Sequence, residues 1–290
     1  MNFNGFVFPC PKFDFRKFRV NQNQLIFIPK KTESISKKHI PCLFLHPESL
    51  NKTKNFMIVF HGNAEDIYSA KVFAEALYKK TLMNIVMVEY PGYSIYKGDS
   101  DADTILENTE IVYDFIKNLF HLSDKNIFIF GRSIGTSPAI YLSSRRKPNA
   151  LCVVSSFTSI RAVANNLVGP LKYLLKERFN SKEYIKNVTC PILFVHGQSD
   201  PLIPYKETLL LKDQCKCPYE VNLPERMTHN DFDLEEDIIN PVDNFIKKHC
   251  LIDTEENNLK NIDEEIKQYK RIPDEIKSYI EANLNKKKNY

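Results

Sequence analysis

The chain has 290 residues, of which 43% are hydrophobic, so it can bury one large core. Its formal net charge is only +4, whereas a nucleic-acid-binding protein usually has a clustered basic stripe and a higher pI. We therefore expect no nucleic-acid partner.

The predicted elements alternate between apolar runs and helically spaced segments. A run such as NFMIVF at 55–60 is typical of a strand buried on both faces. Strands are predicted over residues 24–28, 40–45, 55–60, 84–90, 126–130, 150–154, 191–196 and 219–223. Helices are predicted over 66–79, 102–119, 134–145, 160–179, 204–212 and 234–249. This alternation predicts an α/β protein with a mostly parallel, doubly wound sheet, in which ligands bind at the carboxyl ends of the strands.

The last 40 residues have a different composition. Residues 251–290 are polar and charged, their apolar positions are mainly isoleucines, and Pro273 divides them into two short amphipathic helices. We predict a main domain over 1–250 and a charged helical C-terminal extension over 251–290, which docks on that domain or on a partner.

The seven cysteines are odd in number and scattered, which favours a reducing compartment over a disulfide framework. Cys215 and Cys217 form the only close pair, and no second pair or nearby histidine completes a zinc site. We expect no metal and no cofactor. Residues 1–15 lack the apolar core of a secretory signal, and no run of 18 apolar residues occurs, so we expect a cytoplasmic protein.

A nucleophile motif follows the predicted strand at 126–130. The sequence Gly131-Arg132-Ser133-Ile134-Gly135 is G-x-S-x-G between a strand and a helix, the context of a nucleophile elbow. The turn is so sharp that the positions two before and two after the serine must be small. We predict Ser133 as the nucleophile.

A serine hydroxyl needs a base, and in this architecture the acid and then the histidine follow it in the chain. His229 lies in the loop between the last strand and the last helix, whereas His249 ends a charged helix and is expected to face solvent. Among the acidic residues between 133 and 229, only Asp200 comes just after a strand. We predict His229 as the base and Asp200 as the acid that orients it.

The loop after the strand at 55–60 is predicted to form the oxyanion hole. Its backbone N–H would come from Asn63, beside Gly62, and the second from Ile134, after the nucleophile. His61 is expected to be structural, and Asp66 to cap the following helix.

These blocks resemble a known family. FHGNAED, YPGYSIYKG, IFGRSIGTSPAIYL, VHGQSDPLIP and MTHNDF, together with FVFPCPKF near the start, are similar to the α/β-hydrolase domain-containing 17 and 13 group of Bem46-like serine hydrolases, over about residues 1–250. The resemblance implies the α/β-hydrolase fold and a thioesterase that removes palmitate from cysteines of membrane-bound proteins. It places the catalytic triad on Ser133, Asp200 and His229.

The chain departs from the family at several points. Animal members carry an N-terminal cluster of cysteines that are palmitoylated, whereas only Cys10 lies early here, and Ser94 stands where the family often has glycine. One acyl chain anchors weakly unless a second signal assists. The basic, phenylalanine-rich N-terminus either supplies that signal as a peripheral contact on the cytoplasmic face of a membrane or packs against the fold, which we favour. Its phenylalanines are Phe3, Phe6, Phe8, Phe13, Phe15 and Phe18.

Fewer than 40 residues separate the strands at 150–154 and 191–196, so any cap over the site is small or absent. The leucines and the valine of this connecting segment either line an acyl channel or belong to the core. They are Leu167, Val168, Leu171, Leu174 and Leu175. The function predicted is a long-chain acyl thioesterase or esterase acting on an acylated protein or lipid. The alternatives are a serine peptidase or small-ester hydrolase, and a non-catalytic hydrolase-fold binding module.

Overall fold

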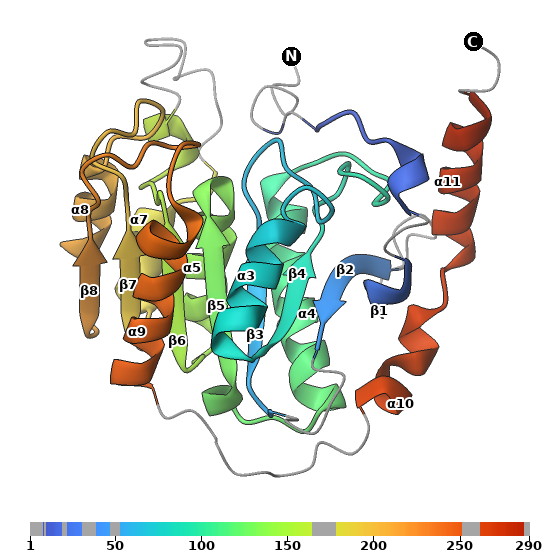
Figure 1. Cartoon of the computed structure of the whole chain (residues 1–290), viewed down its shortest axis with the longest axis horizontal. Coiled ribbons are helices and arrows are strands. Elements are labelled where there is room, and N and C mark those ends of the chain that lie inside the picture. Colours follow the sequence, from blue (N-terminus) through green and yellow to red (C-terminus); the bar gives the residue numbers. More distant parts are fainter. Residues whose placement is uncertain are drawn as a thin grey trace.

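A central sheet organises the protein, seen here in a computed structural model that describes residues 8, 10–18, 22–30, 39–46, 53–163, 178–250 and 262–286. Its eight strands follow the order β1-β2-β4-β3-β5-β6-β7-β8 (Figure 1). β2 pairs antiparallel with β1 and with β4, and all other neighbours are parallel. The strands are β1 (Leu25–Pro29), β2 (His39–Leu45), β3 (Phe56–Phe60), β4 (Asn84–Val88), β5 (Ile127–Arg132), β6 (Ala150–Val154), β7 (Ile192–Val195) and β8 (Tyr219–Asn222).

Helices cover both faces of this sheet. α3 and α9 lie on the face toward the viewer in Figure 1, and α4 and α5 lie behind it. The α-helices are α3 (Lys71–Thr81), α4 (Ala102–Leu119), α5 (Thr136–Arg145), α7 (Ser181–Tyr184), α8 (Lys206–Lys212), α9 (Asn240–His249), α10 (Ile262–Ile266) and α11 (Asp274–Lys286). A π-helical turn (Leu234–Ile239) precedes α9, and a 3₁₀ turn (Ser133–Gly135) precedes α5.

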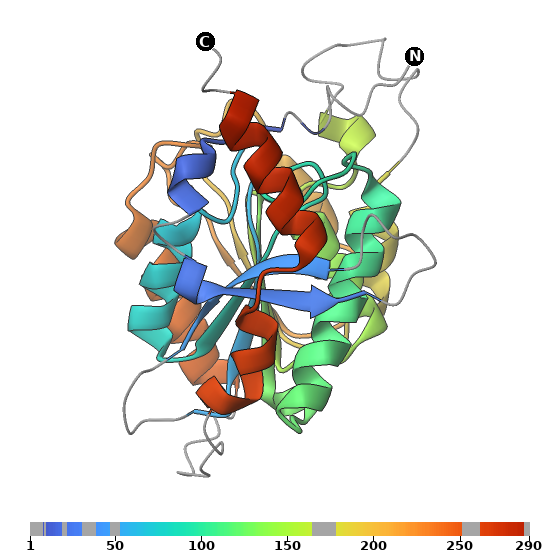
Figure 2. The same cartoon turned by 90° about the vertical axis from the view of Figure 1, so that its right-hand side faces the viewer.

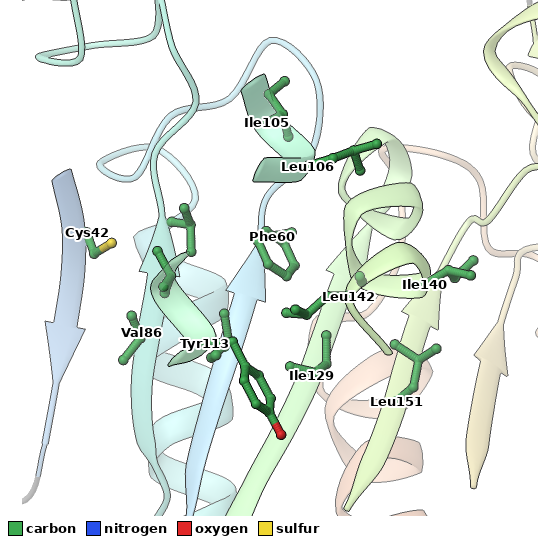
Figure 3. Close-up of a cluster of buried hydrophobic side chains, with 14 of the residues drawn as sticks. Cys42, Phe60, Val86, Ile105, Leu106, Tyr113, Ile129, Ile140, Leu142 and Leu151 are labelled. Atoms are coloured by element: carbon green, nitrogen blue, oxygen red, sulfur yellow. The ribbon is translucent and has the colours of Figure 1, made fainter. Parts of the chain in front are cut away.

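The two faces form two separate hydrophobic clusters because successive side chains of a strand point to opposite sides. In β3, Phe56, Ile58 and Phe60 join the cluster under α4 and α5, whereas Met57 and Val59 join the cluster under α3 and α9. Figure 3 shows part of the first cluster, where Tyr113 of α4 and Leu142 of α5 lie beside Phe60 and Ile129 of the sheet. Both faces being buried explains the continuous apolar runs in the sequence.

The mostly parallel sheet confirms the predicted fold class, and most boundaries agree within two residues. Within the described residues, the largest difference is the helix predicted over 66–79, which begins at Lys71, and most of the helix predicted over 160–179 lies outside them. The Asp66 carboxylate accepts the N–H groups of Tyr68 and Ser69 at 3.0 and 2.8 Å, so this carboxylate closes a turn before the helix instead of capping α3 itself.

The C-terminal extension packs along the β1 edge of the sheet, as the view from that side shows (Figure 2). Ile262 and Ile266 of α10 join one hydrophobic cluster, and Ile276 and Ile280 of α11 join the other. The extension therefore docks on the main domain and spans both faces at an edge that would otherwise offer unpaired backbone groups. The domain boundary at residue 250 stays a prediction, since residues 251–261 lie outside the described part of the chain.

Candidate active site

The nucleophile elbow stands at the carboxyl end of β5. Ser133 has φ of +52°, a left-handed conformation that is strained for a residue with a side chain. A Cβ on Gly131 would lie 2.4 Å from the Gly135 carbonyl oxygen, and a Cβ on Gly135 would lie 2.3 Å from the Phe60 carbonyl oxygen. A side chain at either position would therefore meet backbone atoms, in keeping with the small residues expected there, and β3 is held directly against the turn.

The three residues predicted as a triad form one chain of hydrogen bonds. Ser133 Oγ lies 2.9 Å from His229 Nε2, and His229 Nδ1 lies 2.8 Å from Asp200 Oδ2. The carboxylate accepts the Nδ1 proton, which leaves Nε2 of the neutral imidazole free to accept the serine hydroxyl proton. All three side chains are buried, at the carboxyl ends of β5, β7 and β8.

Asp200 is held in its ionised form by several donors. Burial favours the neutral acid, but hydrogen bonds from His196, His229 and the Ile203 N–H outweigh it and lower the pKa of the Asp200 carboxyl. Asp200 Oδ1 accepts the N–H groups of Leu202 and Ile203 at 2.8 and 2.9 Å. His196 Nε2 lies 3.4 Å from Oδ2, a neighbour that sequence reasoning passed over because His196 follows directly on β7.

This lowered pKa predicts a pH-dependent stability. An Asp that is easier to ionise in the folded chain stabilises it fully above the unfolded-state pKa of about 3.9, and loses that contribution as pH falls through the lower folded value. The wild-type chain should therefore exceed Asp200→Asn in free energy of unfolding most at pH 5 to 7, and the difference should shrink below about pH 4. Urea unfolding of both chains across this range measures it, and a difference that stays constant with pH would contradict it.

The predicted oxyanion loop follows β3. The Gly62 N–H donates to Glu65 Oε2 at 2.8 Å, and the Tyr93 hydroxyl donates to the Asn63 side-chain oxygen at 2.8 Å. These bonds fix the loop on both sides of the Asn63 amide. Ile134 follows Ser133 in the 3₁₀ turn. The assignment of the Asn63 and Ile134 N–H groups to an oxyanion hole stays a prediction.

The buried carboxylate of Glu89 binds residues at the start of this loop. Glu89 Oε1 lies 3.1 Å from His61 Nε2, and the other oxygen accepts the hydroxyl of Ser94. Burial lowers the pKa of His61, but the hydrogen bond to Glu89, the negative charges of Glu89 and Glu65, and the hydrogen bond to the Gly62 carbonyl together raise it by more, so the net shift of the pKa is upward. His61 thus has the structural role expected of it. Ser94 has a φ of +37°, a conformation that glycine adopts more readily than a residue with a side chain.

The structure also places other residues that the sequence singled out. His249 is partly buried, not solvent-facing, because its Nε2 lies 2.6 Å from Glu220 Oε1. Phe8, Phe15 and Phe18 are buried. The ring centroids of Phe13 and Tyr68 lie 4.8 Å apart, so these four phenylalanines pack on the fold. Phe3, Phe6 and the proposed channel residues (Leu167, Val168, Leu171, Leu174, Leu175) lie outside the described residues.

Among the described residues, no group of three or more His, Cys, Asp or Glu side chains is placed to hold a metal ion. None of the described helices is long and apolar enough to cross a membrane. Cys10, the candidate acylation site, is exposed at the protein surface.

Sheet order and elbow define this chain as an α/β-hydrolase in fold, and solved structures agree. The chain superimposes on Est1E from Butyrivibrio proteoclasticus with a TM-score of 0.61 at 17% identity, covering 78% of this chain and 98% of that one. It superimposes on the esterase Pf2001 of Pyrococcus furiosus with a TM-score of 0.64 at 15% identity, covering 83% and 97%.

In sequence, the chain is similar to α/β hydrolase domain-containing proteins 17B and 17C, which confirms the resemblance carried by its motifs. It is 26% identical over 220 residues to the 17B protein of Homo sapiens, covering 76% of this chain and 75% of that protein. It is 27% identical over 190 residues to the 17C protein of Mus musculus, covering 66% and 59%. No protein-family model matches the chain.

Proposed function

We propose that this protein is a serine hydrolase that cleaves acyl esters and thioesters through Ser133, His229 and Asp200. The observation that carries the proposal is the continuous hydrogen-bonded chain from Ser133 Oγ through the His229 imidazole to Asp200. The strained elbow supports it as well, because backbone strain at a buried serine persists where the surrounding structure maintains it for a task.

The geometry supports a two-step reaction. Ser133 Oγ attacks the acyl carbonyl carbon while His229 Nε2 takes its proton, and the N–H groups of Asn63 and Ile134 stabilise the tetrahedral oxyanion. The intermediate collapses, the bond to the leaving sulfur or oxygen breaks, and His229 returns the proton to the departing thiol or alcohol. Water then attacks the acyl-enzyme with His229 again as base, which releases the carboxylic acid and restores Ser133.

The substrate class that we propose is a long acyl chain on a large carrier, as in removal of palmitate from protein cysteines. The similarity to the 17B and 17C proteins supports this class through the family resemblance. A carrier of this kind fits a protein on the cytoplasmic side that contacts a membrane peripherally, with the basic N-terminal segment nearest to it. Arg16 of that segment exposes 79% of its side chain.

An acyl-chain series tests the substrate class. Thioesters and oxyesters from two to sixteen carbons, each at the same concentration below micelle formation, should show kcat/KM rising with chain length. Each buried methylene contributes about 0.8 kcal/mol, or roughly fourfold, so the rise from eight to twelve carbons should exceed tenfold if the site encloses the chain.

Further substrates in the same assay distinguish the alternative functions. Aminoacyl-coumarin substrates report peptidase activity, and their cleavage in preference to all acyl esters would replace the proposed class. A kcat/KM that is flat or falling beyond eight carbons would indicate a small-ester hydrolase.

A further inference from the structure

Arg132, the second residue of the G-x-S-x-G motif, lies at the end of β5 with only 6% of its surface exposed. Its guanidinium binds two other loops of the candidate site. Nη1 donates to Glu65 Oε1 at 2.6 Å, and Nη2 donates to the His229 carbonyl oxygen at 2.8 Å and to Asn230 Oδ1 at 3.1 Å. A charged group so deeply buried is retained only where its donors are satisfied.

Glu65 extends this contact to the oxyanion loop. While Oε1 accepts from Arg132, Oε2 accepts the Gly62 N–H at 2.8 Å. Gly62 is covalently joined to Asn63, whose amide is the predicted oxyanion donor. One guanidinium thus connects the nucleophile, the loop of the base and the loop of the oxyanion hole, which are far apart in the sequence.

Aromatic rings hold the guanidinium in place. Its carbon lies 5.3 Å from the centroid of the Phe73 ring on α3 and 5.4 Å from that of Phe232, in the loop of the base. Planar stacking and a five-donor fork are properties of arginine that lysine lacks. Lysine at this position would keep the charge but lose part of the geometry.

The charge itself matters to the reaction. The Glu65 carboxylate accepts the N–H of Gly62, the residue before Asn63, whose amide is expected to face the developing oxyanion. A negative charge on Glu65 therefore disfavours the negative charge that develops on the substrate oxygen. Arg132 compensates Glu65 by an ion pair whose side chains are 7% and 25% exposed, where water screens little. Removing Arg132 alone would leave that carboxylate uncompensated beside the site.

We propose that Arg132 is a positioning residue of the hydrolase reaction, which aligns His229 and the oxyanion loop with Ser133 and neutralises Glu65 beside the developing anion. This inference rests on the proposed serine hydrolase function. It assigns a role to the variable position of the motif, through atoms that need not touch the substrate.

The experiment compares Arg132→Met, Arg132→Lys, Glu65→Gln and the double variant with the full-length wild-type chain. Arg146→Met is the matched control, because Arg146 pairs with Glu110 and Asp114 at the far end of α5. For each chain, kcat and KM are measured on an ester that the wild type hydrolyses. Hydrogen exchange is measured over residues 61–66 and 227–232, and thermal unfolding controls for the folded fraction.

Arg132→Met should lower kcat by about 10- to 100-fold with KM within about threefold, as expected when reacting groups shift by an ångström or less. Adding Glu65→Gln should recover part of that loss, because it removes the uncompensated charge, and Arg132→Lys should fall between. Exchange should rise in both loops. Arg146→Met should lose stability and keep the wild-type kcat.

Three results would overturn the proposal: a kcat of Arg132→Met equal to that of the control, a double variant no faster than Arg132→Met, or unchanged exchange in both loops. Failure of the proposed function looks different, since the wild-type chain would then hydrolyse no ester or thioester. In that case hydrogen exchange in the Arg132 variants still decides whether this residue holds the two loops together.

Discussion

Replacing Ser133 by alanine is expected to abolish labelling by a fluorophosphonate probe and to lower kcat by about 10⁶-fold, the loss typical of serine hydrolases without their nucleophile. The reason is the geometry of the elbow: Ser133 Oγ lies 2.9 Å from the His229 Nε2 that would deprotonate it. Alanine removes only the hydroxyl group and adds no volume, so the fold should remain. Labelling followed by peptide mapping, together with kinetics on the best ester, makes the measurement.

Asp200→Asn provides the graded comparison for this prediction. Asparagine keeps the nucleophile and the shape of the site but favours the wrong tautomer of His229, which should cost about 10⁴-fold in kcat. Probe labelling should become slow and not vanish. If Ser133→Ala were still labelled, or kept more than about 1% of wild-type kcat, another residue would be the nucleophile and the Ser133 assignment would be wrong.

The positions of the triad could be predicted because each member carries a local signal. Ser133, Asp200 and His229 each follow a strand, and a parallel sheet brings the carboxyl ends of its strands to one edge. The glycines of the elbow are equally local, since the turn itself excludes a side chain at both positions. Chain order and strand ends were therefore sufficient to bring three distant residues together.

The partners of the loops could not be predicted in the same way. Arg132 and Glu65 are 67 positions apart, and Arg132 and Asn230 are 98 apart, with no periodic pattern that connects them. The same holds for Tyr93 and Asn63, where a hydroxyl holds the side chain of the oxyanion loop. Such pairs depend on side-chain directions in the folded chain, and strand and helix spacing leave those directions open.

The helical extension is an intermediate case. Its isoleucine spacing and Pro273 predicted two amphipathic helices. In the structure α10 ends before that proline and α11 begins directly after it. The sequence left open which surface these helices cover, because an amphipathic pattern predicts that one face is buried but not which surface that face packs against. The β1 edge and the two hydrophobic clusters supply the answer.

Replacing Gly135 by alanine is expected to lower the free energy of unfolding by about 3 kcal/mol, toward the upper end for overpacked interiors. The added Cβ would lie 2.3 Å from the Phe60 carbonyl oxygen and 2.6 Å from that of His61. Both are backbone atoms at the end of β3, so no side chain can rotate away, and β3 must separate from the elbow. Because the oxyanion loop begins at His61, activity should fall by more than the folded fraction does. Urea unfolding and kcat measure both effects.

Ser143→Ala, on the helix α5 that follows Gly135, is the matched control. Ser143 is 1% exposed, and its hydroxyl finds no hydrogen-bond partner within the described part of the chain. Alanine removes that unsatisfied group without adding volume, so stability should stay equal or rise, and kcat should not change. If Gly135→Ala behaved like this control, the contact between β3 and the elbow would be looser than the structure has it. The separation of Ser133 from the oxyanion loop would then depend on Arg132 and Glu65 and not on backbone packing.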